Sequence, residues 1–317
     1  MSEDLAGRLL AGDRRALARS LTLVENGGPD GAALLKAIFS RTGKAHLVGI
    51  TGPAGSGKST VTSALTRYYR DAGKTVGVIA VDPSSPFSHG AVLGDRIRML
   101  EHWSDEGVFI RSMATRGALG GLAATTLEAA LVLDAAGKDI VIVETVGAGQ
   151  DEVEIAGLAD TTIVISTPAT GDDIQAMKAG ILEVADVLAV NKADLPGADT
   201  LASQLTALLS MGQERAWKVP VIKVEGTTGA GIPELAESLA RHRAYLMDSG
   251  EMEQLRRRQA RSQIERILRD ELLRQKIRAS GGEEGLEAMV ERVAAREIDP
   301  RSAARDLGRA TSEVAAT

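Results

Sequence analysis

The sequence predicts an α/β fold in which a mostly parallel sheet is flanked by helices on both faces and extended by helices at both ends. Short apolar runs alternate with segments of helical periodicity between Lys44 and Leu246. A glycine-rich phosphate-binding sequence lies between the first run and the helical segment after it. We therefore expect a P-loop nucleoside-triphosphatase domain over residues 44–246, an N-terminal helical extension over 1–43 and a C-terminal helical arm over 247–317.

The apolar runs predict seven strands, most of them buried on both faces. They are His46 to Thr51, Thr75 to Val81, Val108 to Ser112, Asp139 to Glu144, Thr161 to Ser166, Val187 to Asn191 and Val219 to Val224. Before them, residues 2–24 have helical spacing broken at Gly12-Asp13, which predicts two short helices, and a third is expected from Ala32 to Ser40. In a parallel sheet, ligands bind beyond the carboxyl ends of the strands, so the residues after each run are the candidate site.

The amino-acid composition argues against several classes of protein and of binding site. The 317 residues include no cysteine, which excludes disulfides and thiolate metal sites, and the four histidines show no ligand spacing. The net charge of -6 gives no general attraction to nucleic acid. No apolar run is long enough to span a membrane, and the first residues are acidic rather than signal-like. We expect a cytoplasmic protein that binds neither membrane nor nucleic acid.

The stretch from Gly52 to Ser59 is a complete G-x-x-x-x-G-K-S phosphate loop between an expected strand and an expected helix, Ser59 to Arg70. Its glycines let backbone N–H groups surround the phosphates, and Lys58 would reach the β and γ phosphates. Ser59 would offer its hydroxyl to Mg²⁺. The nucleotide-binding candidates here are Gly52, Gly55, Ser56, Gly57, Lys58, Ser59 and Thr60.

Acidic residues end two of the runs. Asp82 follows the second run and is a candidate for Mg²⁺ or for positioning water, the alternative being a turn or cap acid. Glu144 ends the fourth run, where it could contact Mg²⁺ through water, and the Gly147 N–H could meet the γ-phosphate. The alternative for that second segment is a surface turn.

The sequence Asn191-Lys192-Ala193-Asp194 follows the sixth run and predicts guanine as the base. A carboxylate such as that of Asp194 accepts hydrogen bonds from guanine's N1–H and 2-amino group. Adenine offers neither donor, and it would leave the carboxylate unpaired at a cost of about 2 to 5 kcal/mol. GTP is therefore expected in preference to ATP.

Several longer stretches resemble one family closely. They are residues 21–26 (LTLVEN), 49–53 (GITGP), 81–85 (VDPSS), 93–99 (LGDRIRM), 116–121 (RGALGG) and 144–147 (ETVG). With the phosphate loop, they make the chain resemble the MeaB/MMAA (ArgK-type) GTPases, which are G-protein chaperones of cobalamin-dependent acyl-CoA mutases such as methylmalonyl-CoA mutase.

The resemblance implies a SIMIBI-type G3E GTPase fold, GTP/GDP and Mg²⁺ as cofactors, and a cobalamin-dependent acyl-CoA mutase as partner. It places Ser59, Asp82, Asp95 and Glu144 at the metal, and Asn191, Lys192 and Asp194 at the guanine. Residues 171–178 resemble a third switch through which the mutase stimulates hydrolysis, with Gln175 and Lys178 at its functional positions. Composition alone would make that stretch the start of an amphipathic helix. The family's usual Ser-Ala pair near the base is Glu225-Gly226 here.

The tail carries an apolar stripe on a strongly charged helix expected from Glu251 to Ala279. Gly281-Gly282 should break that helix, and a second amphipathic helix is expected from Gly285 to Glu297. The resemblance implies that this arm forms a homodimer. The basic run Arg256 to Arg258 is more typical of a solvated helix face than of a nucleic-acid site.

The predicted function is that of a Mg²⁺-dependent GTPase. It would gate adenosylcobalamin loading onto a mutase and protect or reactivate that enzyme. The candidates for catalysis are Lys58, Glu144, Gln175 and Lys178. One alternative is a metallochaperone GTPase, although the sequence offers no cysteine to hold the metal. Another is an amino-acid or transport-linked kinase, against which the guanine-type sequence argues. A passive binding module is the third, and it would bind GTP without turnover.

Overall fold

The computed structural model describes residues 2–82, 100–102, 104–114, 121–145, 157–168, 181–211 and 215–309. The chain divides into two compact units, residues 1–259 and 260–317. One long helix, α12 (Glu251–Ala279), runs through the boundary between them.

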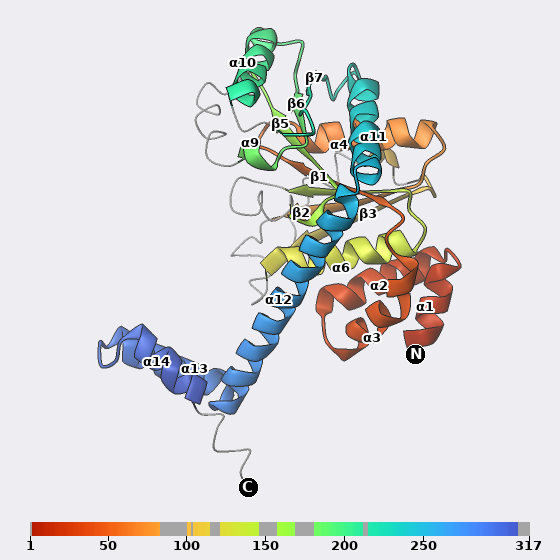
Figure 1. Ribbon diagram of the computed structural model, residues 1–317. Coiled ribbons are helices and arrows are strands. Elements are labelled where there is room, and N and C mark those ends of the chain that lie inside the picture. Colours follow the sequence, from red (N-terminus) through yellow and green to blue (C-terminus); the bar gives the residue numbers. More distant parts are fainter. Residues whose placement is uncertain are drawn as a thin grey trace. The chain divides into compact units, whose positions relative to one another are not determined.

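The first unit is built on a seven-stranded sheet in the order β3-β2-β4-β1-β5-β6-β7, with every neighbouring pair parallel (Figure 1). All seven expected strands are confirmed, and their ends differ from the expected ones by at most two residues. The strands are β1 (His46–Thr51), β2 (Val76–Asp82), β3 (Val108–Ala114), β4 (Ile140–Thr145), β5 (Thr161–Ser166), β6 (Val187–Val190) and β7 (Val221–Lys223). Because all run the same way, their carboxyl ends share one edge of the sheet.

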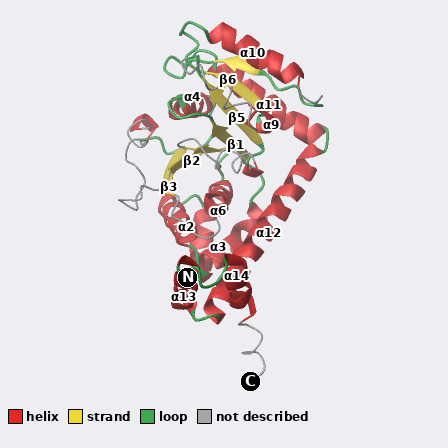
Figure 2. Cartoon of the chain, turned by 90° about the vertical axis from the view of Figure 1, so that its left-hand side faces the viewer, coloured by secondary structure: helices red, strands yellow, loops and turns green. Residues whose placement is uncertain are grey.

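Alternating side chains of the strands enter two cores, one on each face. Val48 and Ile50 of β1 pack in the core that contains α4 and α11, whereas Leu47 packs in the core of the opposite face. Figure 2 shows the strands between their covering helices. The helices and short 3₁₀ turns of this unit are α1 (Ser2–Leu10), α2 (Arg14–Asn26), α3 (Pro29–Ile38), η1 (Phe39–Arg41), α4 (Lys58–Asp71), η2 (Leu100–His102), α6 (Gly121–Ala135), α9 (Ile181–Val184), α10 (Ala198–Met211) and α11 (Ile232–Asp248).

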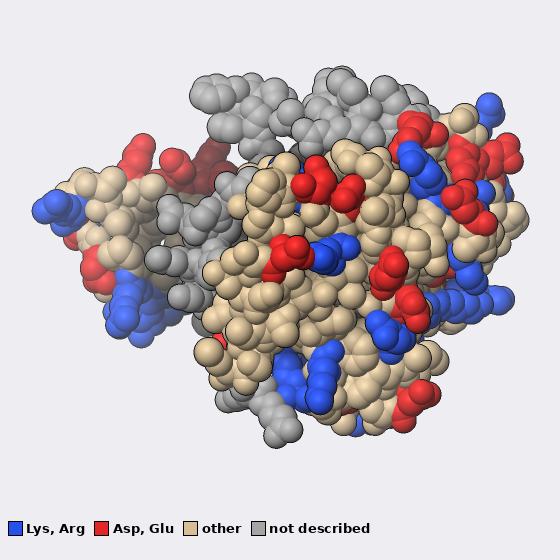
Figure 3. Space-filling model, turned by 90° about the horizontal axis from the view of Figure 1, so that it is seen from above, with Lys and Arg blue, Asp and Glu red and all other residues tan. Residues whose placement is uncertain are grey.

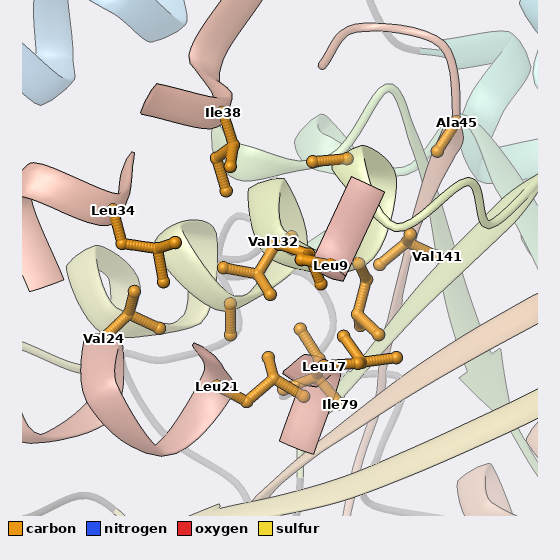
Figure 4. Close-up of a cluster of buried hydrophobic side chains, with 14 of the residues drawn as sticks. Leu9, Leu17, Leu21, Val24, Leu34, Ile38, Ala45, Ile79, Val132 and Val141 are labelled. Carbon is orange, nitrogen blue, oxygen red and sulfur yellow. The ribbon is translucent and has the colours of Figure 1, made fainter. Parts of the chain in front are cut away.

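The first three helices pack against α6 and extend the core of that face (Figure 4). Their predicted break at Gly12-Asp13 is present, because Asp13 caps α2 by accepting from the N–H groups of Arg15 and Ala16 at 2.8 and 3.1 Å. Leu9, Leu21 and Leu34 of these helices are fully buried in this core. This layer is fastened to edge strand β3 by an ion pair of Glu25 with Arg111, whose guanidinium also donates to Thr22 Oγ1 at 3.3 Å.

The segment 43–47 joins these helices to β1, and side chains from distant parts of the chain hold its backbone. Asp134 of α6 accepts from the N–H groups of residues 43, 44 and 45. Asp160 accepts from the N–H of residue 47 at 3.0 Å. Arg243 and Arg256 donate to the carbonyl oxygens of residues 44 and 43 at 2.6 and 2.9 Å. In the basic run of α12, Arg256 therefore fastens this joint, and Arg257 pairs with Glu253 one turn away.

The second unit contains the rest of α12, α13 (Gly282–Ala294) and α14 (Pro300–Arg309). The expected break is present, because Gly281 and Gly282 both adopt positive φ angles, of 97° and 70°. Helix α14 was not expected from the sequence, and Lys276 Nζ donates to its Gly308 carbonyl at 2.7 Å. The apolar stripe of α12 is exposed, with its members 40 to 65 % accessible. They are Ile264, Ile267, Leu268, Leu272 and Leu273.

The outer surface mixes charges of both signs. On the face seen in Figure 3, lysine and arginine side chains alternate with aspartate and glutamate, with uncharged surface between them. Among the described helices, none has the length and apolar character that crossing a membrane requires. Surface charge is therefore distributed and does not form one strong field on that face.

Candidate functional site

The phosphate loop connects β1 to α4 at the carboxyl edge of the sheet, and two of its glycines are required by close contacts. Gly52 has a φ of 141°, and a Cβ there would lie 2.2 Å from the carbonyl oxygen of Ile165 in β5. Gly57 has a φ of 86°, and a Cβ there would lie 2.3 Å from Asn191 Nδ2. Any side chain would collide with fixed neighbours, so the tight turn is open only to glycine. Such a cradle of backbone fits a phosphate group.

Lys58 is the first residue of α4 and lies at the mouth of this loop. It is 6 % exposed, and its Nζ donates to the carbonyl oxygens of Gly52 and Pro53 at 2.6 and 3.0 Å. The ammonium group is thus held over the loop that would receive the phosphates. The N-terminus of a helix of 14 residues adds positive potential at the same place. Both features favour an anionic ligand.

Ser59 and Glu144 form the acidic side of the site. The Ser59 hydroxyl donates to Glu144 Oε1 at 2.5 Å, and both residues are at most 5 % exposed. Their location follows from the register of the sheet, in which Glu144 of β4 is opposite Ile50, one residue before the end of β1. A hydroxyl beside a carboxylate is an all-oxygen donor set, which suits Mg²⁺. Among the described residues, no cluster of three or more His, Cys, Asp or Glu could form a metal cage. The donor set therefore fits an ion whose remaining ligands are phosphate and water.

Asn191 links the phosphate loop to the loop after β7. Its Nδ2 donates to the Ser56 carbonyl at 2.8 Å, and its Oδ1 accepts from the Gly226 N–H at 3.1 Å. The side chain is 3 % exposed, so these two bonds connect buried backbone groups. Lys192 follows with a φ of 58°, and its Nζ donates to the Gly55 carbonyl at 3.1 Å. The first two residues of the predicted guanine sequence thus fix the phosphate loop, while Asp194 is exposed at the surface of the site.

Gly226 is a site residue whose role the sequence did not reveal. A Cβ at this position would lie 3.1 Å from the backbone nitrogen of Val61 in α4, so the glycine permits the loop to lie against the first turns of that helix. Its N–H then reaches Asn191. The neighbouring Glu225 accepts from the Thr228 hydroxyl at 2.9 Å and pairs with Ala230 in an isolated bridge. The glycine after β7 is the sequence signal, because a Cβ there would press closely on the backbone of α4.

Structure and sequence agree on the placement of the described candidates. The loop residues 52–57, the first turn of α4 with Thr60, and Glu144 and Asn191 all lie at the carboxyl edge. Asp82 ends β2 at that edge, and its side chain is outside the described part of the chain. The other four candidates also lie outside the described residues. They are Asp95, Gly147, Gln175 and Lys178.

Comparison with known proteins identifies relatives along nearly the whole chain. A protein of Pyrococcus horikoshii designated as a candidate GTPase is 47 % identical over 306 residues, which cover 95 % of this chain and 96 % of the relative. The methylmalonic aciduria type A homolog of Mus musculus, a mitochondrial protein, is 33 % identical over 284 residues, covering 84 % of this chain and 68 % of that protein. A crystal structure described as LAO/AO transport system kinase superposes with a TM-score of 0.72 at 28 % identity, covering 96 % of both chains.

The family model described as methylmalonyl-CoA mutase-associated GTPase MeaB matches residues 17–281. This range includes the phosphate loop, Glu144 and the guanine-type sequence, together with most of the first unit. The sheet, the loop and the buried lysine are those of a GTP-hydrolysing P-loop protein, as the resemblance of the sequence predicts. The chain is thus a GTPase, and it belongs to the MeaB family.

Proposed function

We propose that this GTPase is a Mg²⁺-dependent chaperone of a cobalamin-dependent acyl-CoA mutase, which gates adenosylcobalamin loading and protects or reactivates the enzyme. The observation that carries the proposal is the match of the mutase-associated family over residues 17–281, which is most of the chain. The mouse relative supports it, because its name refers to methylmalonic acid. We also propose that the protein forms a homodimer through its C-terminal arm, as the resemblance of the sequence implies.

The site can perform hydrolysis by stabilising charge. Water attacks the γ-phosphate, and negative charge develops on the phosphate oxygens and on the leaving group. Lys58 and the helix N-terminus lie where they would stabilise that charge. Ser59 and Glu144 would hold Mg²⁺, which neutralises phosphate charge when it is bound. Asp82 and Asp95 are proposed to complete the metal side.

Among the described residues at the loop, none is a histidine or a carboxylate other than Glu144 that could serve as a general base. We therefore expect slow hydrolysis by the protein alone, and stimulation by the mutase through Gln175 and Lys178. Asp194 would read the guanine from its exposed position.

The test is phosphate release from GTP by the purified protein, with and without candidate cobalamin-dependent acyl-CoA mutases. Stimulation by one mutase supports the proposal, and loss of the rate on chelating Mg²⁺ supports the metal assignment. The variant Gln175→Ala should lose the stimulated part of the rate, and the matched control Gln204→Ala, on the exposed side of α10, should keep it. Unchanged turnover with every mutase would contradict the chaperone role while leaving the GTPase activity intact.

The exposed stripe of α12 gives the homodimer its own test. Leu268 is 53 % exposed. If the stripe is a dimer interface, the variant Leu268→Glu, which places a carboxylate there, should be a monomer in light scattering. The matched variant Glu265→Gln changes a neighbouring polar side chain and should leave the mass unchanged. A monomeric wild-type protein would contradict the dimer proposal.

An amino-acid or transport-linked kinase is the second candidate, because the superposed crystal structure is described as a transport system kinase. A kinase would transfer the γ-phosphate to an acceptor instead of water. The two functions are separated by supplying γ-labelled GTP or ATP. Label recovered only as inorganic phosphate, from GTP and not ATP, excludes the kinase.

A further inference from the structure

Four polar side chains form a connected row at the edge of the sheet opposite the phosphate loop. His46 begins β1, Thr161 begins β5, Asp186 precedes β6, and His242 lies in α11. His46 Nε2 is 2.8 Å from Thr161 Oγ1, and Thr161 Oγ1 is 2.9 Å from His242 Nδ1. His242 Nε2 faces Asp186 Oδ1 across 3.5 Å. We call this row the relay, in the order Asp186, His242, Thr161, His46.

Three of the four members of the relay are buried, and the side chain of Asp186 is 30 % accessible. His46, Thr161 and His242 are each at most 3 % exposed. Both histidines stay neutral at physiological pH, because burial lowers the pKa of His46 to about 3 and that of His242 to about 4. A neutral imidazole has one N–H and one bare nitrogen, and a hydroxyl has a single proton. The direction of one hydrogen bond therefore fixes the direction of the next.

Two arrangements satisfy the relay. In the first, Asp186 is ionised, His242 carries its proton on Nε2 toward the carboxylate, Thr161 donates to His242 Nδ1, and His46 donates from Nε2 to Thr161. In the second, Asp186 is protonated on Oδ1, which leaves His242 Nε2 bare. His242 then donates from Nδ1 to Thr161, Thr161 donates to His46 Nε2, and the His46 proton is on Nδ1. The second arrangement holds one more proton in total, the one on Asp186.

The surroundings of Asp186 determine which of its oxygens takes that proton. Its Oδ2 already accepts from the Thr162 N–H at 2.8 Å, so Oδ1, which faces His242, is the oxygen that titrates. Burial raises the pKa of Asp186 to about 6, against the opposing effects of the Thr162 N–H and the nearby Arg215. Trp217 Nε1 donates to the Asp186 carbonyl at 2.8 Å, and its ring is 4.9 Å from that of His242.

The other charged groups around the relay are few. Glu251 of α12 lies near His242 and favours its charged form, and Arg243 lies near His46 and disfavours the charged form. Tyr245 stacks on His242 and donates to Glu251. Arg243 and Glu251 thus affect the pKa values of His46 and His242, and neither group adds a proton to the row.

We propose that the relay is a proton-driven switch that reverses when the row gains one proton. His242 Nε2 gives its proton to Asp186, Thr161 gives its proton to His242 Nδ1, and His46 Nε2 gives its proton to Thr161. The added proton binds His46 Nδ1, so the N–H of His46 changes from Nε2 to Nδ1. The signal thereby passes from the entry of β6 to the entry of β1, the strand that leads into the phosphate loop. Both hydrogen bonds of Thr161 are kept in the reversal, with donor and acceptor exchanged. The proposal is independent of the chaperone role.

The test is ¹⁵N NMR of the histidine rings in the full-length protein between pH 7.5 and 5. The chain has only four histidines, and His46→Gln identifies the signal of that residue. The His46 ring nitrogens should exchange their shifts with a midpoint near pH 6, together with the Asp186 carboxyl signal. In Thr161→Val, which keeps the shape of the side chain and removes its hydroxyl, Asp186 should still titrate while His46 no longer responds.

Two further variants test the proposal, one that should abolish the response of His46 and one that should leave it unchanged. Asp186→Asn should abolish the exchange at His46. The matched control is Asp139→Asn. The Asp139 side chain likewise accepts from a backbone N–H just before a strand, that of Thr75, at 2.8 Å. Among the described residues, its one hydrogen bond with a histidine is made by its backbone carbonyl, which accepts from the His46 N–H at 2.9 Å and is kept in the variant. In Asp139→Asn, Asp186 should titrate and His46 should respond as they do in the wild-type protein. If His46 keeps one tautomer while Asp186 titrates, or exchanges equally in Thr161→Val, the relay is refuted. Thr161→Val decides the matter should Asp186→Asn fail to fold.

Discussion

Replacement of Asn191 by alanine tests the claim that the guanine-type sequence holds the phosphate loop in place. The amide makes two hydrogen bonds, to the Ser56 carbonyl and from the Gly226 N–H, and it is 3 % exposed. Asn191→Ala leaves both backbone groups without their partner. Each unsatisfied buried group costs about 1 to 3 kcal/mol, and partial access of water reduces the sum to about 2 to 4 kcal/mol of unfolding free energy.

That loss should lower the melting temperature by about 4 to 12 °C for a unit of this size, and it should weaken GTP binding as well. Calorimetry and nucleotide titration measure the two effects. Asn26→Ala is the matched control, because Asn26 is the only other asparagine of the chain and lies exposed at the end of α2. Equal melting temperatures for the two variants would refute the role given to Asn191.

A double-mutant cycle sharpens the same test. Gly57→Ala incurs about 1 to 2 kcal/mol of backbone strain at its φ of 86°, and its Cβ also meets Asn191 Nδ2 at 2.3 Å. Asn191→Ala removes the second cost and leaves the first. The double variant should therefore be more stable than the sum of the single effects predicts, by about 0.5 to 3 kcal/mol. Strict additivity would mean that the two residues do not touch.

Three further outcomes follow from other contacts. Lys58→Ala should lower GTP hydrolysis by roughly 100-fold or more in a phosphate-release assay, because the charge over the loop is lost; near-wild-type turnover would exclude Lys58 from catalysis. Glu25→Ala should reduce the unfolding free energy by about 1 to 3 kcal/mol in urea, because its arginine partner on β3 stays half-buried; no change in the midpoint would show that the pair is screened. Stability should fall as pH drops from 6.5 toward 4, because His46 and His242 take up protons only on unfolding, with pKa values of about 3 and 4 in the fold. Asp186, with a pKa of about 6, and Asp160, whose pKa is raised by burial, bind protons in the fold and offset part of this loss. In His46→Gln, equilibrium unfolding at several pH values should show a smaller dependence of stability on pH. An unaltered dependence would contradict the role given to His46.

The sheet was predictable because its signals are local. Each strand is a short apolar run with a polar residue at its end or directly after it. A strand that is buried on both faces can be recognised from its own apolar residues, without knowing which strands lie beside it. The phosphate loop was predictable for the same reason, since its glycines and lysine act within eight residues. Helix α14 was missed because its ten residues contain a single leucine and four charged side chains, so small residues such as Ala303 make up much of its apolar face.

The roles of Asn191 and Arg256 could be predicted only in part. The sequence predicted that Asn191 contacts the guanine. Its described hydrogen bonds are made with backbone groups of two loops, at Ser56 and at Gly226, which lie 135 and 35 residues away in the sequence. For Arg256 the sequence favoured a solvated helix face. The structure has the residue exposed, and its guanidinium also donates to the carbonyl of Gly43, 213 residues earlier. Contacts across such separations depend on the whole sheet being assembled. A pattern of neighbouring residues carries no information about them.

The joint at residues 43–47 has a consequence for the order in which the protein matures on the ribosome. Its backbone is held by Asp134, Arg243 and Arg256, which are synthesised long after the joint itself. Domains fold largely as they emerge, N-terminal parts first. The helices of the prefix can meet α6 once residue 135 is available, but the strand that leads to the phosphate loop gains its last fastenings only when the start of α12 has left the exit tunnel. Nascent chains that stop before that helix would carry the complete phosphate loop on an entry strand that is not yet secured.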